Sequence, residues 1–281
     1  MTNDDAGSGA RTARGGTDRQ EECLDRPRDP LPTRVEACPP LPTAYDDALD
    51  GALAACGIVL DAAARHAIDG HVRLLLAWNT AINLTSVRDP AEVAIRHVAD
   101  SLTALATIRD ARIGAFLDLG SGGGFPGIPL AAAAPSVETL LIDSVGKKAR
   151  FLAVAADAIG LAGRVRVGSV RAEGLAADGR HREQWPAVTV RAVGPLADLV
   201  ELAFPLLHPG GLLIAWKRGD IEAELESASR ALHALGGGSI DVRPVALPAL
   251  AGHALVVVRR GRRSVPAAYP RDPATRRRRP W

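Results

Sequence analysis

The sequence predicts an α/β protein with a doubly wound, mostly parallel sheet, and three observations support this. Apolar strand-like runs alternate with helical segments between residues 111 and 260. A glycine-rich turn directly follows the first run, in the segment FLDLGSGGGFPGIPLAA at 116–132. Charged residues stand at the ends of successive strands. In such a fold, ligands bind at the carboxyl ends of the strands.

The glycine turn begins where the strand at 116–119 ends. Gly120, Gly122 and Gly124 recur at every second position, and Gly127 opens a helix. Glycine allows the backbone to bend sharply and to approach a ligand closely. The helix start adds free N–H groups and the positive end of a dipole. We therefore expect a nucleotide-like ligand over this turn.

Two ligands fit the turn. Residues 122–127 match G-x-G-x-x-G, a dinucleotide fingerprint that is weak alone. The wider pattern D-x-G-x-G-x-G begins at Asp118, whose carboxylate would suit the amino group of S-adenosylmethionine. Asp143 ends the next strand, LLID, where an acid binds ribose hydroxyls. The remaining alternative is a glycine turn that holds no ligand.

The rest of this domain follows the same alternation. We expect strands at 140–143, 165–167, 187–190 and 211–216, an antiparallel pair at 242–246 and 254–258, and helices at 146–158, 196–207 and 220–235. The expected strand ends carry Asp118, Asp143, Glu173, Arg191 and Lys217.

Residues 43–110 predict a helical segment that packs on this domain. Asp89 and Pro90 mark the start of one helix as its N-cap and first residue. The preceding stretch holds Asn83, Thr85 and Ser86, which either end a helix through side-chain hydrogen bonds or line a cleft. The helix after Asp89 carries Arg96, His97, Asp100 and Ser101, spaced so that His97 reaches the last two.

The two ends differ from the body. Residues 1–42 lack a periodic apolar face and predict a disordered extension. Residues 261–281 predict a basic tail, because 259–281 carry nine arginines and one aspartate in a chain of net charge +2. Such a tail either contacts RNA phosphates or is simply solvated.

Composition excludes several classes. A chain of 281 residues with 47% hydrophobic content can build a sizeable core. No apolar run approaches the roughly 20 residues that span a bilayer, and the N-terminus lacks a signal core. We expect a cytoplasmic protein without a membrane partner. Cys23, Cys38 and Cys56 lack metal or disulfide spacing, so we expect no metal site.

Six segments together resemble the RsmG (GidB) family of bacterial 16S rRNA guanine-N7 methyltransferases. They are WNTAINLTSVRDPAEVAIRHVADSL at 78–102, FLDLGSGGGFPGIPLA at 116–131, LLIDSVGKKARFL at 140–152, RAEGL at 171–175, VRAVGPL at 190–196 and WKRG at 216–219. YPRDP at 269–273 resembles the family's terminal motif. The resemblance covers roughly residues 45–273.

The resemblance implies a Rossmann-like methyltransferase, S-adenosyl-L-methionine as cofactor, and 16S ribosomal RNA or the small ribosomal subunit as partner. It implies cofactor binding at Gly120, Gly122, Phe125, Asp143, Ala172, Glu173 and Arg191. The simplest expectation is a monomer. Guanine N7 has an exposed lone pair and no proton, so we expect no catalytic acid or base. Phe125 and Trp78 are candidates to stack on the target guanine.

Two rival functions remain open from the sequence. One is an NAD(P)-dependent oxidoreductase that uses the G-x-G-x-x-G match; binding of S-adenosylhomocysteine but not NAD separates the two. The other is a non-enzymatic RNA-binding or assembly protein that keeps a degenerate nucleotide fold. The complete glycine turn and Asp143 argue against it.

Overall fold

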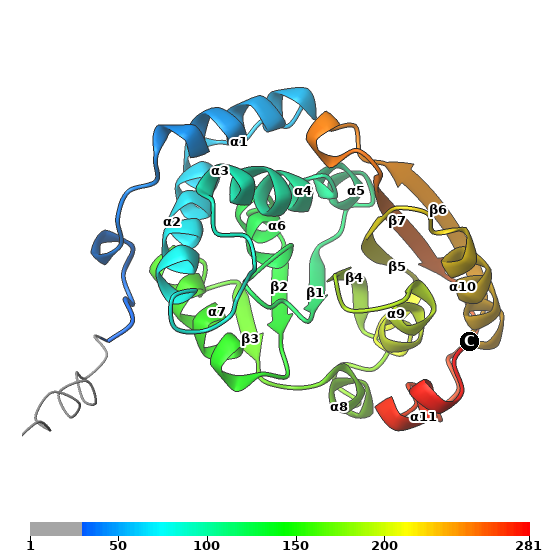
Figure 1. Ribbon diagram of the computed structural model, residues 1–281. Helices are drawn as coiled ribbons and strands as arrows, with labels where there is room; N and C mark the ends of the chain where they lie inside the picture. The colour runs from blue at the N-terminus through cyan, green and yellow to red at the C-terminus, as the bar shows by residue number, and fades with distance from the viewer. Residues whose placement is uncertain (1–29) are drawn as a thin grey trace, which may run out of the picture. The chain divides into compact units, whose positions relative to one another are not determined.

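The computed structural model describes residues 30–281 and contains a seven-stranded sheet (Figure 1). The strands lie in the order β3-β2-β1-β4-β5-β7-β6. The first five are parallel, whereas β7 is antiparallel to both β5 and β6. Their bounds are β1 Ala115–Leu119, β2 Glu138–Ile142, β3 Val165–Gly168, β4 Trp185–Arg191, β5 Leu207–Arg218, β6 Gly238–Pro244 and β7 His253–Arg260.

The central strands are buried on both faces. Phe116 and Leu117 of β1, and Val188 and Val190 of β4, are fully buried. Burial on both faces explains why these strands are continuous apolar runs rather than alternating patterns. The predicted doubly wound α/β fold is confirmed, including the antiparallel pair of β6 and β7.

Helices cover the sheet as the alternation predicted. Within the described residues, α2 packs against α6 and α7, and α9 packs against α10 and α8. The helices are α1 Thr43–Ala55, α2 Ala62–Trp78, α3 Pro90–Val93, α4 Asp100–Leu102, α5 Leu105–Asp110, α6 Gly127–Ala133, α7 Gly146–Ala158, α8 Ala172–Ala177, α9 Leu196–Ala203, α10 Glu222–Ala234 and α11 Pro273–Arg278. The helix expected at 196–207 ends at Ala203, because β5 begins at Leu207. Helices α5 and α8 were not predicted, since six residues are too few for a periodic pattern.

One helical stretch contains an irregular turn. Helix α3 begins as predicted, with the Asp89 carboxylate accepting a hydrogen bond from the Glu92 N–H at 2.9 Å. It continues through a π-helical turn, η2 (Ala94–Ala99), into α4. Turns of this kind often occur at functional sites, because the extra residue redirects side chains. Here η2 carries Arg96 and His97.

The expected N-terminal extension, 1–42, differs from the structure where it is described. Residues 1–29 lie outside the described residues. From Pro32 onward the chain packs along α2: the Trp78 indole N–H donates to the Pro32 carbonyl at 2.7 Å, and Arg73 donates to the Pro39 carbonyl at 2.9 Å. The short 3-10 turn η1 (Val35–Ala37) buries only Val35. A single buried residue gives no periodicity, so the sequence did not show this contact.

The expected basic tail, 261–281, is also not a free segment. Val265 is buried, Arg271 binds the buried Glu201, and residues 273–278 form α11. Arginines that the composition assigned to solvent or to RNA are thus partly used within the chain. The reason is tertiary: their carboxylate partners lie on α8 and α9, far away in sequence.

Candidate functional site

The glycine turn joins β1 to α6 and is held by the neighbouring strand. The N–H groups of Gly120 and Ser121 both donate to the Ile142 carbonyl at 2.9 Å. The Asp143 carboxylate accepts from the Gly122 N–H at 3.0 Å and from the Val145 N–H at 2.8 Å. Gly120 has φ of 72° and Gly122 has φ of 55°, a region that favours glycine. The turn therefore needs these glycines for its shape.

A cavity of about 210 Å³ lies beside the turn. Gly120, Asp143, Ala172 and Glu173 line it, so four of the seven residues expected to bind the cofactor meet there. They come from the ends of β1 and β2 and from α8. Its full lining is Leu119, Gly120, Ile142, Asp143, Ser144, Val170, Arg171, Ala172, Glu173, Val193, Asp198, Leu199, Leu202 and Arg276.

Three charged residues of this small cavity were not among the expected cofactor residues, namely Arg171, Asp198 and Arg276. Asp198 lies in the first turn of α9, directly after the loop that follows β4. The rule that ligands bind beyond the carboxyl ends of strands would have found Asp198. Arg276 comes from α11 and meets Glu173 across 103 positions in sequence. No local pattern indicates that meeting.

Asp118 occupies a different place from the one expected. It is fully buried and lines neither cavity of the site. Its carboxylate accepts from the Thr189 hydroxyl at 2.7 Å and faces Gly127 at the start of α6. Burial raises the pKa of Asp118 to about 6. The expectation that this carboxylate meets the cofactor's amino group is wrong, because the side chain points beneath the turn.

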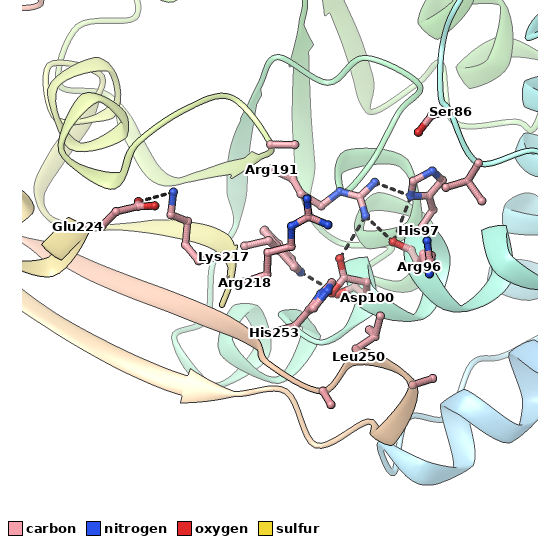
Figure 2. Close-up of a pocket in the computed structure, with 15 residues that line it drawn as sticks. Ser86, Arg96, His97, Asp100, Arg191, Lys217, Arg218, Glu224, Leu250 and His253 are labelled. Carbon is pink, nitrogen blue, oxygen red and sulfur yellow. Dashed lines mark hydrogen bonds and ion pairs between the residues drawn. The ribbon is translucent and has the colours of Figure 1, made fainter. Parts of the chain in front are cut away.

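A second, larger cavity of about 810 Å³ opens on the other side of the β4 end (Figure 2). Ser86 and Val87 line it, so the polar stretch before Asp89 does reach a cleft. Most of its charged residues are basic, and Arg218 is exposed within it. Its lining is Ser86, Val87, Arg96, His97, Asp100, Arg191, Ala192, Trp216, Lys217, Arg218, Glu224, Ala249, Leu250, Ala251 and His253.

Arg191 ties the N-terminal helices to the sheet at this cavity. Its Nη1 donates to the Arg96 carbonyl at 2.9 Å and to Asp100 at 3.2 Å, while Nη2 donates to Nδ1 of His97 at 3.1 Å (Figure 2). The Asp100 carbonyl also accepts from the Trp216 indole at 2.7 Å. Arg191 thus lies at the larger cavity, apart from the residues of the smaller one.

The protonation of His97 follows from these contacts. A guanidinium only donates, so Nδ1 accepts from Arg191 and the ring proton is on Nε2. Nε2 then donates to the Thr85 hydroxyl at 2.6 Å, and the 3.1 Å approach of Nδ1 to the Arg96 carbonyl is not a hydrogen bond. Burial and then the Arg191 charge lower the pKa of His97 to about 4. The imidazole is therefore neutral at pH 7.

Phe125 supports the site from below. Its ring stacks on His97 with centroids 4.9 Å apart, lies 4.8 Å from the His71 ring, and has the Arg191 Cζ 5.4 Å from its centre. It is 5% exposed and lines neither cavity. Trp78 is also buried, against Phe151. Neither ring is therefore available to stack on a guanine, contrary to the sequence-based expectation.

The two cavities are separated by the loop after β4. Ala192 lines the larger cavity and Val193 the smaller one. Ala192 has φ of 58°, which is strained for a residue with a Cβ atom. Lys217 Nζ holds the loop by donating to the Gly194 carbonyl at 2.9 Å and pairs with Glu224 at 2.5 Å. The strand-end residues are thus divided: Asp143 and Glu173 on one side, Arg191 and Lys217 on the other.

The fold of this chain has a counterpart among solved structures. A solved O-methyltransferase from Bacillus cereus, described as in complex with SAH, has a similar fold, with a TM-score of 0.53, 13% identity and coverage of 77% of this chain and 100% of that chain. At this identity the likeness shows the fold, which is the Rossmann-like α/β fold of that O-methyltransferase.

The chain belongs to the GidB family, described as rRNA small subunit methyltransferase G, whose family model matches residues 65–246. A ribosomal RNA small subunit methyltransferase G from Roseiflexus sp. (strain RS-1) is 42% identical over 206 residues, which cover 73% of this chain and 87% of that protein. Another, from Roseiflexus castenholzii, is 43% identical over 197 residues, covering 70% and 83%. The resemblance seen in the sequence is confirmed.

Within residues 30–281, no helix has both the length and the apolar character that a transmembrane helix needs.

Proposed function

We propose that this chain binds S-adenosyl-L-methionine in the smaller cavity and methylates N7 of a guanine in a loop of 16S ribosomal RNA, held in the larger cavity. The observation that carries the proposal is the division of the site by residues 192 and 193, because it puts a nucleoside-sized pocket next to a basic one. Family membership supplies the substrate class.

The residues of the smaller cavity fit the cofactor. The bare backbone of Gly120 permits close approach, and the carboxylates of Asp143 and Glu173 suit ribose hydroxyls and cationic groups. Asp143 uses one lone pair of each oxygen on the turn, so each oxygen retains acceptor capacity. When bound, the cofactor supplies an electrophilic methyl group on a sulfonium.

In this proposal Phe125 and Arg191 do not contact the cofactor but hold the residues around it in place. They brace η2 against the end of β4, and so fix the wall between cofactor and substrate. Gly122 contributes through its N–H bond to Asp143. Of the seven residues the resemblance implied, four thus face the cofactor and three hold the frame.

Methyl transfer to guanine N7 requires no acid or base from the protein. Guanine N7 attacks with its own lone pair, so the chain contributes alignment and exclusion of water. A neutral His97, with its one proton donated to Thr85, agrees with a site that neither supplies nor removes a proton. N7 is hidden in the deep groove of A-form RNA, so the target base must be in a loop or extruded.

The larger cavity supplies contacts for RNA. Arg96 and Arg218 are exposed there, and a guanidinium plane both neutralises phosphate and stacks on a base. We assign base stacking to these arginines, in place of the buried Phe125 and Trp78. Of the C-terminal arginines, Arg277, Arg278 and Arg279 are exposed and free to meet phosphate as well. Action on ribosomal RNA supports a cytoplasmic location.

The test uses labelled S-adenosylmethionine with small-subunit particles or their RNA, and mass spectrometry to locate the label. We expect 7-methylguanine at one loop position, and S-adenosylhomocysteine binding without NAD binding. Asp143→Ala should abolish both, whereas Asp157→Ala, exposed on α7, should change neither. NAD binding would favour the oxidoreductase. If the unmodified protein binds neither S-adenosylhomocysteine nor NAD, the result would favour a non-enzymatic assembly protein.

A further inference from the structure

The C-terminal segment 269–281 forms part of the wall of the smaller cavity. We call it the C-terminal clasp. It lies across α9, where the Trp281 indole donates to Glu201 at 2.7 Å and stacks near Tyr269 with centroids 5.9 Å apart. Arg230 of α10 holds the Trp281 carbonyl at 3.1 Å. The clasp is therefore fixed by two helices of the central domain.

One buried ion pair anchors the clasp. Arg271 binds Glu201 through both side-chain branches, with Nη2 to Oε2 at 2.5 Å and Nε to Oε1 at 3.0 Å. Glu201 is fully buried, and the Arg271 guanidinium also lies 4.6 Å from the centre of the Trp281 ring. A buried carboxylate needs such a partner, so the position of Arg271 is strongly determined.

From this anchor the clasp extends Arg276 into the cavity. Arg276 Nη1 donates to the Arg271 carbonyl at 2.6 Å, and Nη2 donates to Glu173 Oε1 at 2.6 Å. The two side chains of the pair are 11% and 20% exposed. Both residues line the smaller cavity. Within residues 30–281, Oε2 of Glu173 accepts no hydrogen bond from another side chain or backbone group, so it stays available to a ligand.

The positive charge of Arg276 offsets the negative charges of the smaller cavity. The cavity contains three carboxylates, those of Asp143, Glu173 and Asp198. Like charges in a partly buried space repel, and an unpaired glutamate side chain turns toward water. Burial raises the pKa of Asp198, and Arg276 is the first charge that opposes this rise. Arg276 therefore keeps both acids compatible with one cavity.

We propose that Arg276 is a positioning residue for cofactor binding, which holds the Glu173 carboxylate so that its second oxygen faces S-adenosylmethionine. The clasp, and not only the Rossmann-like domain, then sets cofactor affinity. This inference rests on the proposed function, because it takes the smaller cavity as the cofactor site.

The test measures S-adenosylhomocysteine binding by calorimetry and the KM for S-adenosylmethionine with small-subunit RNA. Arg276→Ala should raise the dissociation constant for S-adenosylhomocysteine and the KM for S-adenosylmethionine about tenfold, because one charge-assisted hydrogen bond is lost. The kcat at saturating cofactor should be nearly unchanged. Arg276→Lys should recover part of the affinity. Arg277→Ala is the matched control, since Arg277 is exposed on the same helix α11.

A double variant separates positioning from a general structural effect. If Arg276 acts through Glu173, then Arg276→Ala adds no further loss to Glu173→Ala. Additive losses, unchanged affinity in Arg276→Ala, or tighter binding would each overturn the inference. If the unmodified protein does not bind S-adenosylhomocysteine, the proposed function itself fails instead.

Discussion

Arg191 donates a hydrogen bond to the His97 ring at 3.1 Å, although the two residues are 94 positions apart in sequence. One lies at the end of β4 and the other in the π-helical turn η2. The same guanidinium binds Asp100, so one side chain joins the N-terminal helices to the sheet. Arg191 therefore holds the wall of the larger cavity together with the Trp216 indole, which donates to the Asp100 carbonyl.

This cation should control the titration of His97. Arg191→Leu should raise the pKa of His97 above its value of about 4, because a neighbouring positive charge disfavours imidazolium. Burial, the larger cause, should still hold the pKa below the ordinary 6.5. An NMR titration of the ring resonances measures this. Arg88→Leu, at an exposed position, should leave the curve unchanged, and an unchanged curve in Arg191→Leu would contradict the assignment.

His71 should make the stability of the protein depend on pH. It is fully buried, donates from Nε2 to the Gly123 carbonyl at 2.8 Å, and burial lowers its pKa from 6.5 to about 4. The native state then binds fewer protons than the unfolded state between these values. The stability that neutral His71 contributes is fully present above pH 6.5 and is lost as the pH falls toward 4. Over this range the free energy of unfolding should fall by on the order of 3 kcal/mol.

Urea denaturation of the unmodified protein and of His71→Gln at pH 7 and pH 4.5 tests this linkage. We expect a shallower pH dependence in the variant, and an unaltered slope in His66→Gln, which is exposed on the same helix. Asp118 acts in the opposite sense: its raised pKa of about 6 makes stability fall as the pH rises from about 4 to 6. Equal slopes for His71→Gln and the unmodified protein would refute the assignment.

Adding a methyl group should destabilise the protein by different amounts at two glycines of the turn. Gly127→Ala would overlap Leu141 and lie 2.8 Å from the Asp118 carboxylate, so we expect a loss of about 3 kcal/mol. Apart from its chain neighbours, no described residue lies nearer than 3.8 Å to a methyl group added at Gly122. Only the φ of 55° is unfavourable there, so we expect the free energy of unfolding to fall by about 1 kcal/mol. Thermal denaturation of both variants ranks them. The reverse order would mean that the packing under the turn is looser than described.

The anchor of the C-terminal clasp should matter for folding. Arg271→Met leaves the fully buried Glu201 without its cation, and we expect a loss of about 3 kcal/mol. Arg277→Met, on the exposed side of α11, should have little effect. Chemical denaturation compares the two. Equal stability of Arg271→Met and the unmodified protein would contradict this role of the ion pair.

Much of the fold was predictable, because its signals are local. Seven apolar runs, the glycine turn and the cap at Asp89 each lie within a few neighbouring residues. That Asp143 and Glu173 lie at one cavity was predictable, because the carboxyl ends of parallel strands meet at one edge of the sheet. Phe125 and Asp118 were misjudged because a position beside the turn does not reveal whether the side chain points over it or beneath it.

The fold class, the glycine turn and the family follow from the order of residues, because periodicity, glycine spacing and motif order are local features of the chain. Which charged and polar side chains meet depends on how the chain folds: Arg191 with His97, Arg276 with Glu173, and Arg271 with Glu201. These pairs join segments 70 to 103 positions apart. Their energy depends on distance and burial, which the order of residues does not encode. Only in the folded chain does Arg276 of the basic tail line the smaller cavity.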